Sequence, residues 1–591
     1  FERAKRFANK LNNIQIKIRV HYQLAWTFIN WYDDYKEFYS EYLGFKQLVW
    51  KEPNLSNIEL YLNLFNILRT VSSIEEVKDH VTIDFKSEED DFTSFLAKCS
   101  LSEDKLSTAL LSKFYLSFIR ISNNLDSSTI VSEELIKLEG YFEISKHHLD
   151  IPFEQLKQVI EVYGKLLPDN KEYDNLIDVI AELEAIRVSE LSSGQIYLNR
   201  GVTKLQSNYN RESLIFFGKA SRKLAKEETQ SEFYFCLMLL SEAYSKLGLY
   251  WASYNALVSA ANIYANNWFT TGNLNPRFIR SIENILKNEV IIGRVPILLC
   301  WYELYNVVKK YLQDNNTSSR EELPTEHLTD ACLAVRLLNA PFEAFIQYTN
   351  LPDILRNNEL WLSSDAVLYL LGNEDLIEID EVQTSLTTEK LSDYYNKFAN
   401  QPFVEQMAYD TNLLAKHEII LETQILGINL KIQTIANAGL MILSESILAY
   451  FESYLATSFE DAFPLSEKII LEISSSKIDT LFSFENKGKS AFQLVINESF
   501  PLKGKNIADI MNSILPQIIA SNYVFKDYKS FFDNLYRNDE VGERLSIILE
   551  HKNFLTNILT SKPKFFLKDW KSDLVKNYKL NRESSPVFLT R

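Results

Sequence analysis

The sequence predicts a mainly α-helical protein built as an α-solenoid, in which helical hairpins stack one on the next. Only 15 glycines and 14 prolines occur among 591 residues, each less than half of the usual share of about 7% and about 5%. Leucine, isoleucine, phenylalanine and tyrosine recur mostly at helical spacing, as in residues 60–68 and 106–114. Because a chain this long exceeds what one core supports, we expect several domains or a stack of elements.

Residues 231–265 have the pattern of a hairpin whose two helices nest closely. Large and small residues alternate at helical spacing, at Leu237, Leu240, Ser241, Tyr244, Ser253, Leu257 and Ala260. The preceding segment has the corresponding residues at Tyr197, Gly201, Ser213, Phe217 and Ala220. Small residues at fixed places let one helix approach the next without steric conflict, so both segments are expected to form helix pairs.

In this pattern the region 190–312 resembles the tetratricopeptide repeat, although Arg200 and Lys204 stand where that family usually has large apolar residues. An unrelated pair of antiparallel helices is the alternative. The resemblance implies a scaffold that binds a protein or peptide in a groove lined by the inner helices. The groove residues expected from it are Tyr197, Asn199, Lys204, Asn208, Tyr234, Tyr244 and Lys246.

The net charge of −17 and the isoelectric point near 5.1 disfavour broad capture of nucleic acid or of an anionic membrane, and favour protein partners. Two acidic clusters could bind a basic partner or a cation, or simply be solvated. They are Glu88, Glu89, Asp90 and Asp91, and then Glu374, Asp375, Glu378, Asp380 and Glu381. We expect neither a metal site nor a cofactor.

Four cysteines, Cys99, Cys236, Cys300 and Cys332, lie far apart in largely apolar settings. Their spacing fits neither a zinc site nor a small disulfide framework, so buried thiols in a reducing cytoplasm are expected. The longest charge-free apolar candidate, Ile432 to Ser444, is shorter than the roughly 20 residues that span a bilayer. The sequence therefore predicts a soluble, cytoplasmic protein.

Polar breaks at 122–128, 166–174 and 313–326 divide the chain. The expected regions are an N-terminal helical region 1–126, a helical connector 127–189, the repeats 190–312, a linker and helical region 313–400, and a C-terminal region 401–591.

The N-terminal region is dense in aromatic residues. These side chains indicate packing in a core, with an exposed recognition surface as the alternative. They include Tyr22, Trp26, Phe28, Trp31, Tyr32, Tyr35, Phe38, Tyr39 and Tyr42.

Residues 402–463 are predicted to form one or two very long helices, with Gly427 and Gly439 as bends. Their apolar positions cover more than one face, which indicates burial on several sides. Two arrangements satisfy this expectation. The chain could form a homodimer through residues 402–463, or these helices could be a spine inside one subunit.

Apolar residues alternate with period two farther on, which predicts strands near 468–474, 480–486 and 491–497. We expect them to form a three-stranded meander, with a hairpin turn at 486–489 and a covering helix from about Asn506. Three strands are too few for a large-sheet enzyme, but they could supply a docking edge or part of an effector domain.

Motifs for catalysis are sparse: there is no phosphate-binding glycine loop, no HExxH and no GxSxG. The adjacent His147 and His148 point in different directions on a helix, so a surface pair is expected there. Arg544 and His551, seven residues apart, would share one helix face. This spacing resembles the RxxxxxxH motif of HEPN-type ribonucleases, which implies metal-independent RNA cleavage with the arginine on the phosphate and the histidine in proton transfer.

The sequence thus favours a non-enzymatic adaptor or sensor that binds a protein partner through its repeat groove. Richness in Asn, Lys, Ile, Tyr and Phe suits an AT-rich genome and would fit a regulatory subunit of a bacterial defence or stress system. The alternative is an effector whose C-terminal ribonuclease activity is regulated by the solenoid.

Overall fold

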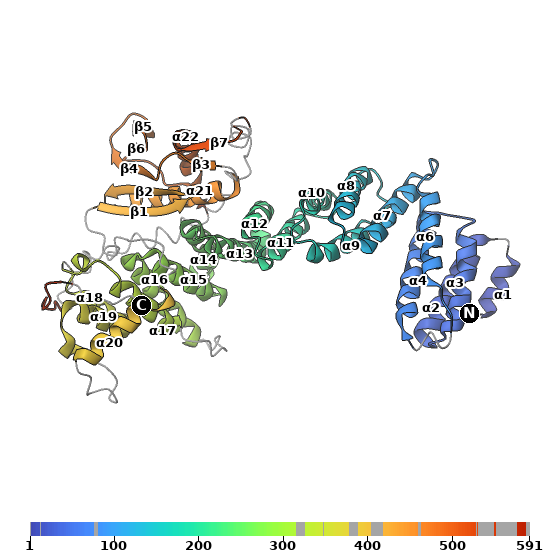
Figure 1. Ribbon diagram of the computed structural model, residues 1–591, viewed down its shortest axis with the longest axis horizontal. Coiled ribbons are helices and arrows are strands. Elements are labelled where there is room, and N and C mark those ends of the chain that lie inside the picture. The colour runs from blue at the N-terminus through green and yellow to red at the C-terminus, as the bar shows by residue number, and fades with distance from the viewer. Residues whose placement is uncertain are drawn as a thin grey trace. The chain divides into compact units, whose positions relative to one another are not determined.

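The computed structural model divides into two compact units, Phe1–Ser193 and Gly194–Arg591. Both are mainly helical, and a mixed β-sheet occurs in the second (Figure 1). The helical part of the predicted fold class is therefore confirmed. The residues that the structure describes are 2–11, 13–75, 81–314, 325–346, 348–377, 388–403, 418–435, 437–458, 462–527, 529, 549–550, 576–584 and 586.

The first unit is helical throughout its described part. Polar side chains fix several helix starts: the Asn13 side chain accepts hydrogen bonds from the backbone N–H groups of Gln15 and Ile16, and Asp34 accepts one from Glu37. The helices are α1 (Glu2–Lys10), α2 (Ile14–Trp31), α3 (Tyr35–Val49), α4 (Leu55–Ser73), α6 (Phe85–Cys99), α7 (Leu106–Asn123), α8 (Ser128–Ser145), α9 (Phe153–Leu166) and α10 (Lys171–Arg187).

The aromatic residues of this unit are divided between core and surface. Tyr61 and Phe65 pack on Phe92, with ring centroids 4.7 Å and 4.5 Å from that of Phe92. Trp31 and Tyr32, at the end of α2, are instead 79% and 69% exposed. Packing in a core is therefore confirmed for the buried rings, while a recognition surface at the exposed Trp31 and Tyr32 stays a prediction.

The acidic cluster of this unit has cationic partners. Lys46 donates hydrogen bonds to Glu88 at 2.6 Å and to Asp91 at 3.0 Å, and Arg69 lies 3.5 Å from Glu89. These pairs join α6 to α3 and α4. The cluster thus has a structural role within the fold.

The second unit begins with consecutive helices that pack each against the next from α12 to α16. Gly272 and Gly293 end α14 and α15 in the left-handed conformation that favours glycine. The helices before the sheet are α11 (Glu190–Gln206), α12 (Asn210–Leu224), α13 (Gln230–Lys246), α14 (Tyr250–Thr271), α15 (Arg277–Ile292), α16 (Val295–Asp314), α17 (Thr325–Leu338), α18 (Leu351–Asn357), α19 (Trp361–Leu371) and α20 (Thr388–Ala399), with the short helices η1 (Glu227–Thr229), η2 (Phe342–Ala344) and η3 (Glu374–Leu376).

The two predicted helix pairs are present as α11–α12 and α13–α14, and their pattern residues lie inside. All seven pattern positions of α13 and α14 are buried, including Leu237, Ser241 and Ala260. A Cβ atom at Gly201 would lie only 2.5 Å from the Phe217 ring, so α11 and α12 approach this closely because residue 201 has no side chain.

The late part of the second unit contains a five-stranded sheet of order β1-β2-β4-β6-β5 and a two-stranded sheet, β3-β7. Its strands are β1 (Glu418–Ile425), β2 (Ile428–Ile435), β3 (Ala462–Pro464), β4 (Lys468–Ser476), β5 (Phe482–Gly488), β6 (Ala491–Asn497) and β7 (Tyr523–Phe525), and its helices are α21 (Ala438–Ser458) and α22 (Gly504–Asn522).

The three predicted strands are present as β4, β5 and β6, and β5 and β6 form the expected hairpin. The predicted meander is wrong, because β4 pairs in parallel with β6 and not with β5. β4 lies instead between β6 and β2, also in parallel with β2.

The prediction of very long helices over 402–463 is also wrong within the residues described there. The segment 418–435 is the β1–β2 hairpin, which turns at Leu426 and Gly427, with φ of 46° and 82°. Residues Ile428, Leu430 and Ile432 point inward with period two. Among the described residues of 402–463, the α-helix is α21, and Gly439 lies in its first turn, not at a bend.

Helix α21 is buried inside the chain. It contacts β1, β2 and β4 of the sheet and also α12, α14 and α22. This burial accounts for its apolar residues on more than one face and fits a spine within one subunit. The long helices on which the expected dimer depended are absent from the described part of 402–463.

The cysteines are predicted from the sequence to be buried thiols. Cys99, Cys236 and Cys300 are buried, and Cys332 is partly exposed. Among the described helices, none is long and apolar enough to cross a bilayer.

Candidate functional site

Helices α13, α14 and α15 enclose a cavity of about 700 Å³. Residues of α13 form one wall and residues of α15 the other, while Ser253 and Leu257 of α14 lie at the floor. We call this cavity the α13–α15 groove. Its volume is within the range of pockets that bind ligands.

The α15 wall is cationic. Arg277, Arg280, Asn284 and Lys287 recur every three or four residues, so they share one face of the helix. Arg277, Arg280 and Lys287 are exposed. A hydrogen bond with the Tyr264 hydroxyl raises the pKa of Arg277, and a second hydrogen bond, to Ser231 at 2.8 Å, helps to position its guanidinium.

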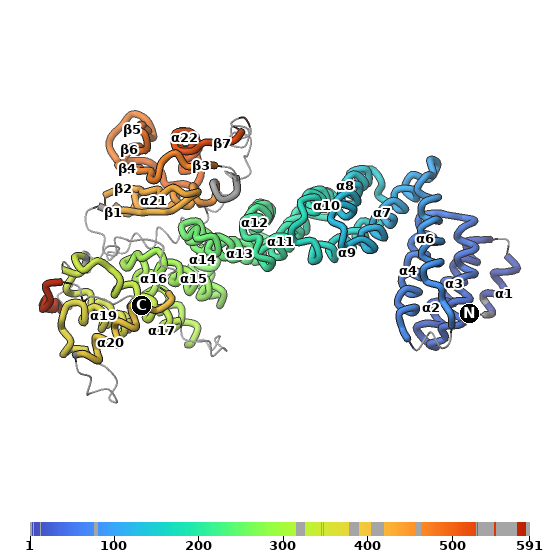
Figure 2. The backbone as a smooth tube through the Cα atoms, in the orientation of Figure 1, coloured from blue at the N-terminus to red at the C-terminus, as the bar shows by residue number. Residues whose placement is uncertain are grey.

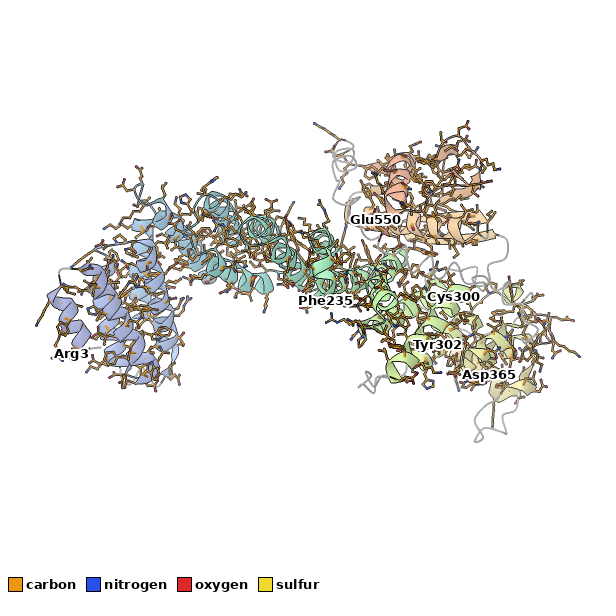
Figure 3. All side chains as sticks on the ribbon, turned by 180° about the vertical axis from the view of Figure 1, so that it is seen from behind. Arg3, Phe235, Cys300, Tyr302, Asp365 and Glu550 are labelled. Carbon is orange, nitrogen blue, oxygen red and sulfur yellow. The ribbon has the colours of Figure 1, made fainter. Side chains whose placement is uncertain are left out.

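The α13 wall combines charge with apolar surface. Lys246 lies 3.0 Å from Glu242, the one acidic residue in the lining. Phe235, labelled in Figure 3, is 51% exposed on the same helix, and Met238 and Leu239 also line the groove. The groove therefore offers four cations, one carboxylate and an apolar strip.

The floor is held by hydrogen bonds between helices. The Tyr234 hydroxyl donates to the backbone carbonyl of Arg277 at 2.9 Å, and Asn288 Nδ2 donates to Ser253 Oγ at 2.9 Å. Ser241 Oγ lies 3.1 Å from the same Ser253 hydroxyl. Burial raises the pKa of Tyr234, so its hydroxyl stays a neutral donor and the walls remain in register.

Two of the seven residues expected to bind a partner, Tyr234 and Lys246, line this groove. Tyr197 and Lys204 are buried, at 5% and 1% exposure. Asn199 and Asn208 are exposed on α11 and at the turn after it, away from the groove lining.

Tyr244 lies outside the groove lining, at the junction between α13, α14 and α21. Its hydroxyl is hydrogen-bonded to Ser453 of α21. At the same junction Trp251 Nε1 donates to the Glu422 carbonyl of β1 at 2.8 Å, and the Ala252 N–H donates to Glu452 at 2.8 Å. Tyr244 is therefore buried between elements of one chain, where a partner does not reach it.

Sequence reasoning missed the three cations of α15. Their signal was present as the spacing of Arg277, Arg280 and Lys287 on one helix face. It was not sufficient alone, because cations on one face usually mark a solvated surface. Only the facing α13 wall makes them part of a cavity.

The remaining sequence candidates are placed only in part by the described residues. Arg544 and His551 lie outside the described residues. His148 Nδ1 lies 3.1 Å from the Ser107 hydroxyl, which gives it a structural contact. Within the described residues, no group of three or more His, Cys, Asp or Glu side chains is arranged to hold a metal ion.

Comparison with known proteins adds no relative. No protein-family model matches the chain, and neither a curated protein nor a solved structure matches it.

Proposed function

We propose that this chain is a non-enzymatic adaptor that binds an acidic segment of a protein partner in the α13–α15 groove. The observation that carries the proposal is the gathering of Lys246, Arg277, Arg280 and Lys287 along one cavity of a chain whose net charge is −17. Four cations against one carboxylate produce a locally positive site that attracts carboxylates.

The apolar strip favours a peptide over a nucleic acid. Phe235, Met238 and Leu239 can accept apolar side chains of a bound segment while the α15 cations pair with its carboxylates. A nucleic acid would instead require a longer basic track along its phosphates. Tetratricopeptide-like stacking is part of this proposal, and the close nesting of α11 and α12 at Gly201 supports it.

The test is binding of a fluorescein-labelled ten-residue peptide of alternating glutamate and leucine, measured by anisotropy at low salt. Arg280→Glu and Lys287→Glu should each weaken binding about tenfold, because each places like charges together. Lys310→Glu is the matched control, since Lys310 is exposed on α16 outside the groove. It should change the affinity less than twofold.

Two further probes sharpen this result. A peptide with glutamine in place of glutamate should bind weakly, and added salt should weaken binding of the acidic peptide. If Arg280→Glu, Lys287→Glu and Lys310→Glu all bind the acidic peptide as tightly as the unchanged chain, the proposal is refuted. Tighter binding of a ten-nucleotide RNA than of the acidic peptide would also refute it and would favour a nucleic-acid partner.

A further inference from the structure

Residues 576–584 form neither helix nor strand and lie against the turns that precede α18 and follow α19 (Figure 2, dark red segment near α19). The Tyr578 N–H donates to the Thr349 carbonyl at 3.0 Å, and the Asn581 N–H donates to the Leu371 carbonyl at 2.8 Å. Asn373 Nδ2 donates to the Lys579 carbonyl at 2.7 Å. Hydrogen bonds to the backbone of a segment are one way in which proteins hold a peptide.

Side chains of the segment add specificity. Tyr578 is 8% exposed, and its hydroxyl lies 3.4 Å from Asp353, which also accepts the Lys576 N–H at 3.0 Å. Asn581 Nδ2 donates to Asn373 Oδ1 at 3.0 Å. The tyrosine and the asparagine are thus each recognised by a defined partner.

Arg582 makes the charged contact. It pairs with Glu374, and its guanidinium carbon lies 4.5 Å from the centroid of the Tyr369 ring. An arginine held between a carboxylate and an aromatic face is a specific arrangement, because lysine cannot match both contacts.

The receiving surface is shaped for this approach. Gly372 has a φ of 77° at the end of α19, and a Cβ atom there would lie 2.7 Å from Cγ of Arg582 and 3.2 Å from its backbone nitrogen. Asn373, which bonds the segment with both ends of its amide, is 5% exposed. Gly372 and Asn373 therefore form a fixed surface against which the backbone of residues 576–584 can lie closely.

We propose that Thr349, Asp353 and residues 369–374 form a peptide-recognition site, distinct from the α13–α15 groove, whose ligand is a segment with tyrosine, asparagine and arginine at relative positions 1, 4 and 5. Residues 576–584 are its occupant in this structure and are exchangeable with the same segment of a second copy. Exchange follows from the modest contact, since Tyr578 is the single buried side chain among residues 576–584.

The test uses the full chain with Tyr578→Ala and Arg582→Ala, which vacates the site, and a fluorescein-labelled peptide with the sequence of residues 574–586. The vacated chain should bind the peptide. The unchanged chain should bind it at least tenfold more weakly, because its own segment competes at an effective concentration of order millimolar. Failure of the vacated chain to bind, with an unaltered melting curve, overturns the proposal.

A charge exchange tests the site itself. Glu374→Arg in the vacated chain should abolish binding of the natural peptide, and a peptide carrying Arg582→Glu should bind this variant and not its Glu374 parent. The same variants should still bind the acidic peptide in the α13–α15 groove, which shows that the chain is folded. Unchanged affinity after Glu374→Arg overturns the proposal without affecting the adaptor proposal.

Discussion

Buried carboxylates occur in both compact units, and the two units stabilise them in different ways. In the first unit, the buried Glu41 and Glu134 pair with lysines that are partly exposed to solvent. In the second, the glutamates at the junction of α14 with α21 are closed off on every side. The same residue type therefore responds to pH in opposite directions in the two places.

Glu41 and Glu134 represent the first unit. Burial alone would raise the pKa of each carboxyl, but hydrogen bonds from His21 and Lys5 to Glu41, and from Lys137, Ser117 and Arg120 to Glu134, hold it below its ordinary value. The side chains of Lys137 and Arg120 are 43% and 56% exposed. Lys137 and Arg120 therefore place positive charge beside the carboxylate while they remain in contact with solvent.

Glu452 of α21 represents the junction. It is fully buried, and burial raises its pKa from 4.5 to about 8, against the opposing effect of hydrogen bonds from Thr423 and from the backbone of Ala252. Its carboxyl caps α14, which has no side-chain cap of its own. The Glu452 carboxyl here accepts a hydrogen bond from a backbone N–H at the helix start, which would otherwise lack a partner.

Arg294 makes a second set of contacts at this junction. It donates from Nε to Glu289 at 3.0 Å and from Nη1 to Glu445 at 2.6 Å, and its guanidinium lies 4.9 Å from the Trp251 ring centroid. Even beside this arginine, burial raises the pKa of Glu289 to about 7. Ionisation of a carboxyl group is thus costly at the buried junction, whereas it is favourable for Glu41 and Glu134, whose cationic partners are partly exposed.

The largest effect is expected from Arg294→Met, which leaves Glu289 and Glu445 buried without their cation. The second unit should lose about 3–5 kcal/mol of unfolding free energy, measured by chemical denaturation. Lys137→Met in the first unit should cost about 1 kcal/mol or less, because its ion pair is solvated. Replacing Arg294, Glu289 and Glu445 together by apolar residues should recover most of the lost unfolding free energy. If Arg294→Met and Lys137→Met lower the unfolding free energy equally, the comparison between the two units is contradicted.

A smaller effect is expected from the pH dependence of Glu452. Because its folded-state pKa is raised, the stability it contributes is complete below about pH 4.5 and is lost as the pH rises towards 8. Glu452→Gln should remove this dependence, so the two chains should diverge by up to about 4 kcal/mol between pH 5 and pH 8.5. Thermal unfolding of the second unit at both pH values measures it, and parallel pH profiles would show that Glu452 does not titrate there.

The smallest effect is expected from Glu134→Gln, and its pH dependence has the opposite sign. The lowered pKa means that stability is present above the ordinary glutamate value of 4.5 and is lost as the pH falls below it. The variant should be less stable by about 1 kcal/mol at pH 7 and should match the unchanged chain near pH 3. A difference that persists at pH 3 would indicate a packing defect instead of a lost ion pair.

The sequence by itself determined the features that depend on local pattern. Scarce glycine and proline predicted helices, and the small residues at Gly201 and Ser241 predicted the two helix pairs, because close helix packing requires small side chains at fixed spacing. Period-two alternation located β4, β5 and β6. Each of these signals is contained within a few turns or one strand.

Only the tertiary structure decided what depends on distant neighbours. Residues 418–435 are rich in Ile and Leu, a composition that fits a helix or a strand, so the pairing of β1 with β2 and of β2 with β4 made them strands. The parallel pairing of β2 with β4 required the α21 crossover, which no local pattern specifies. The cations of α15 became a groove only opposite α13, and Glu452 became a neutral cap only when α21 met α14, because burial and charge are set by what surrounds a residue in space.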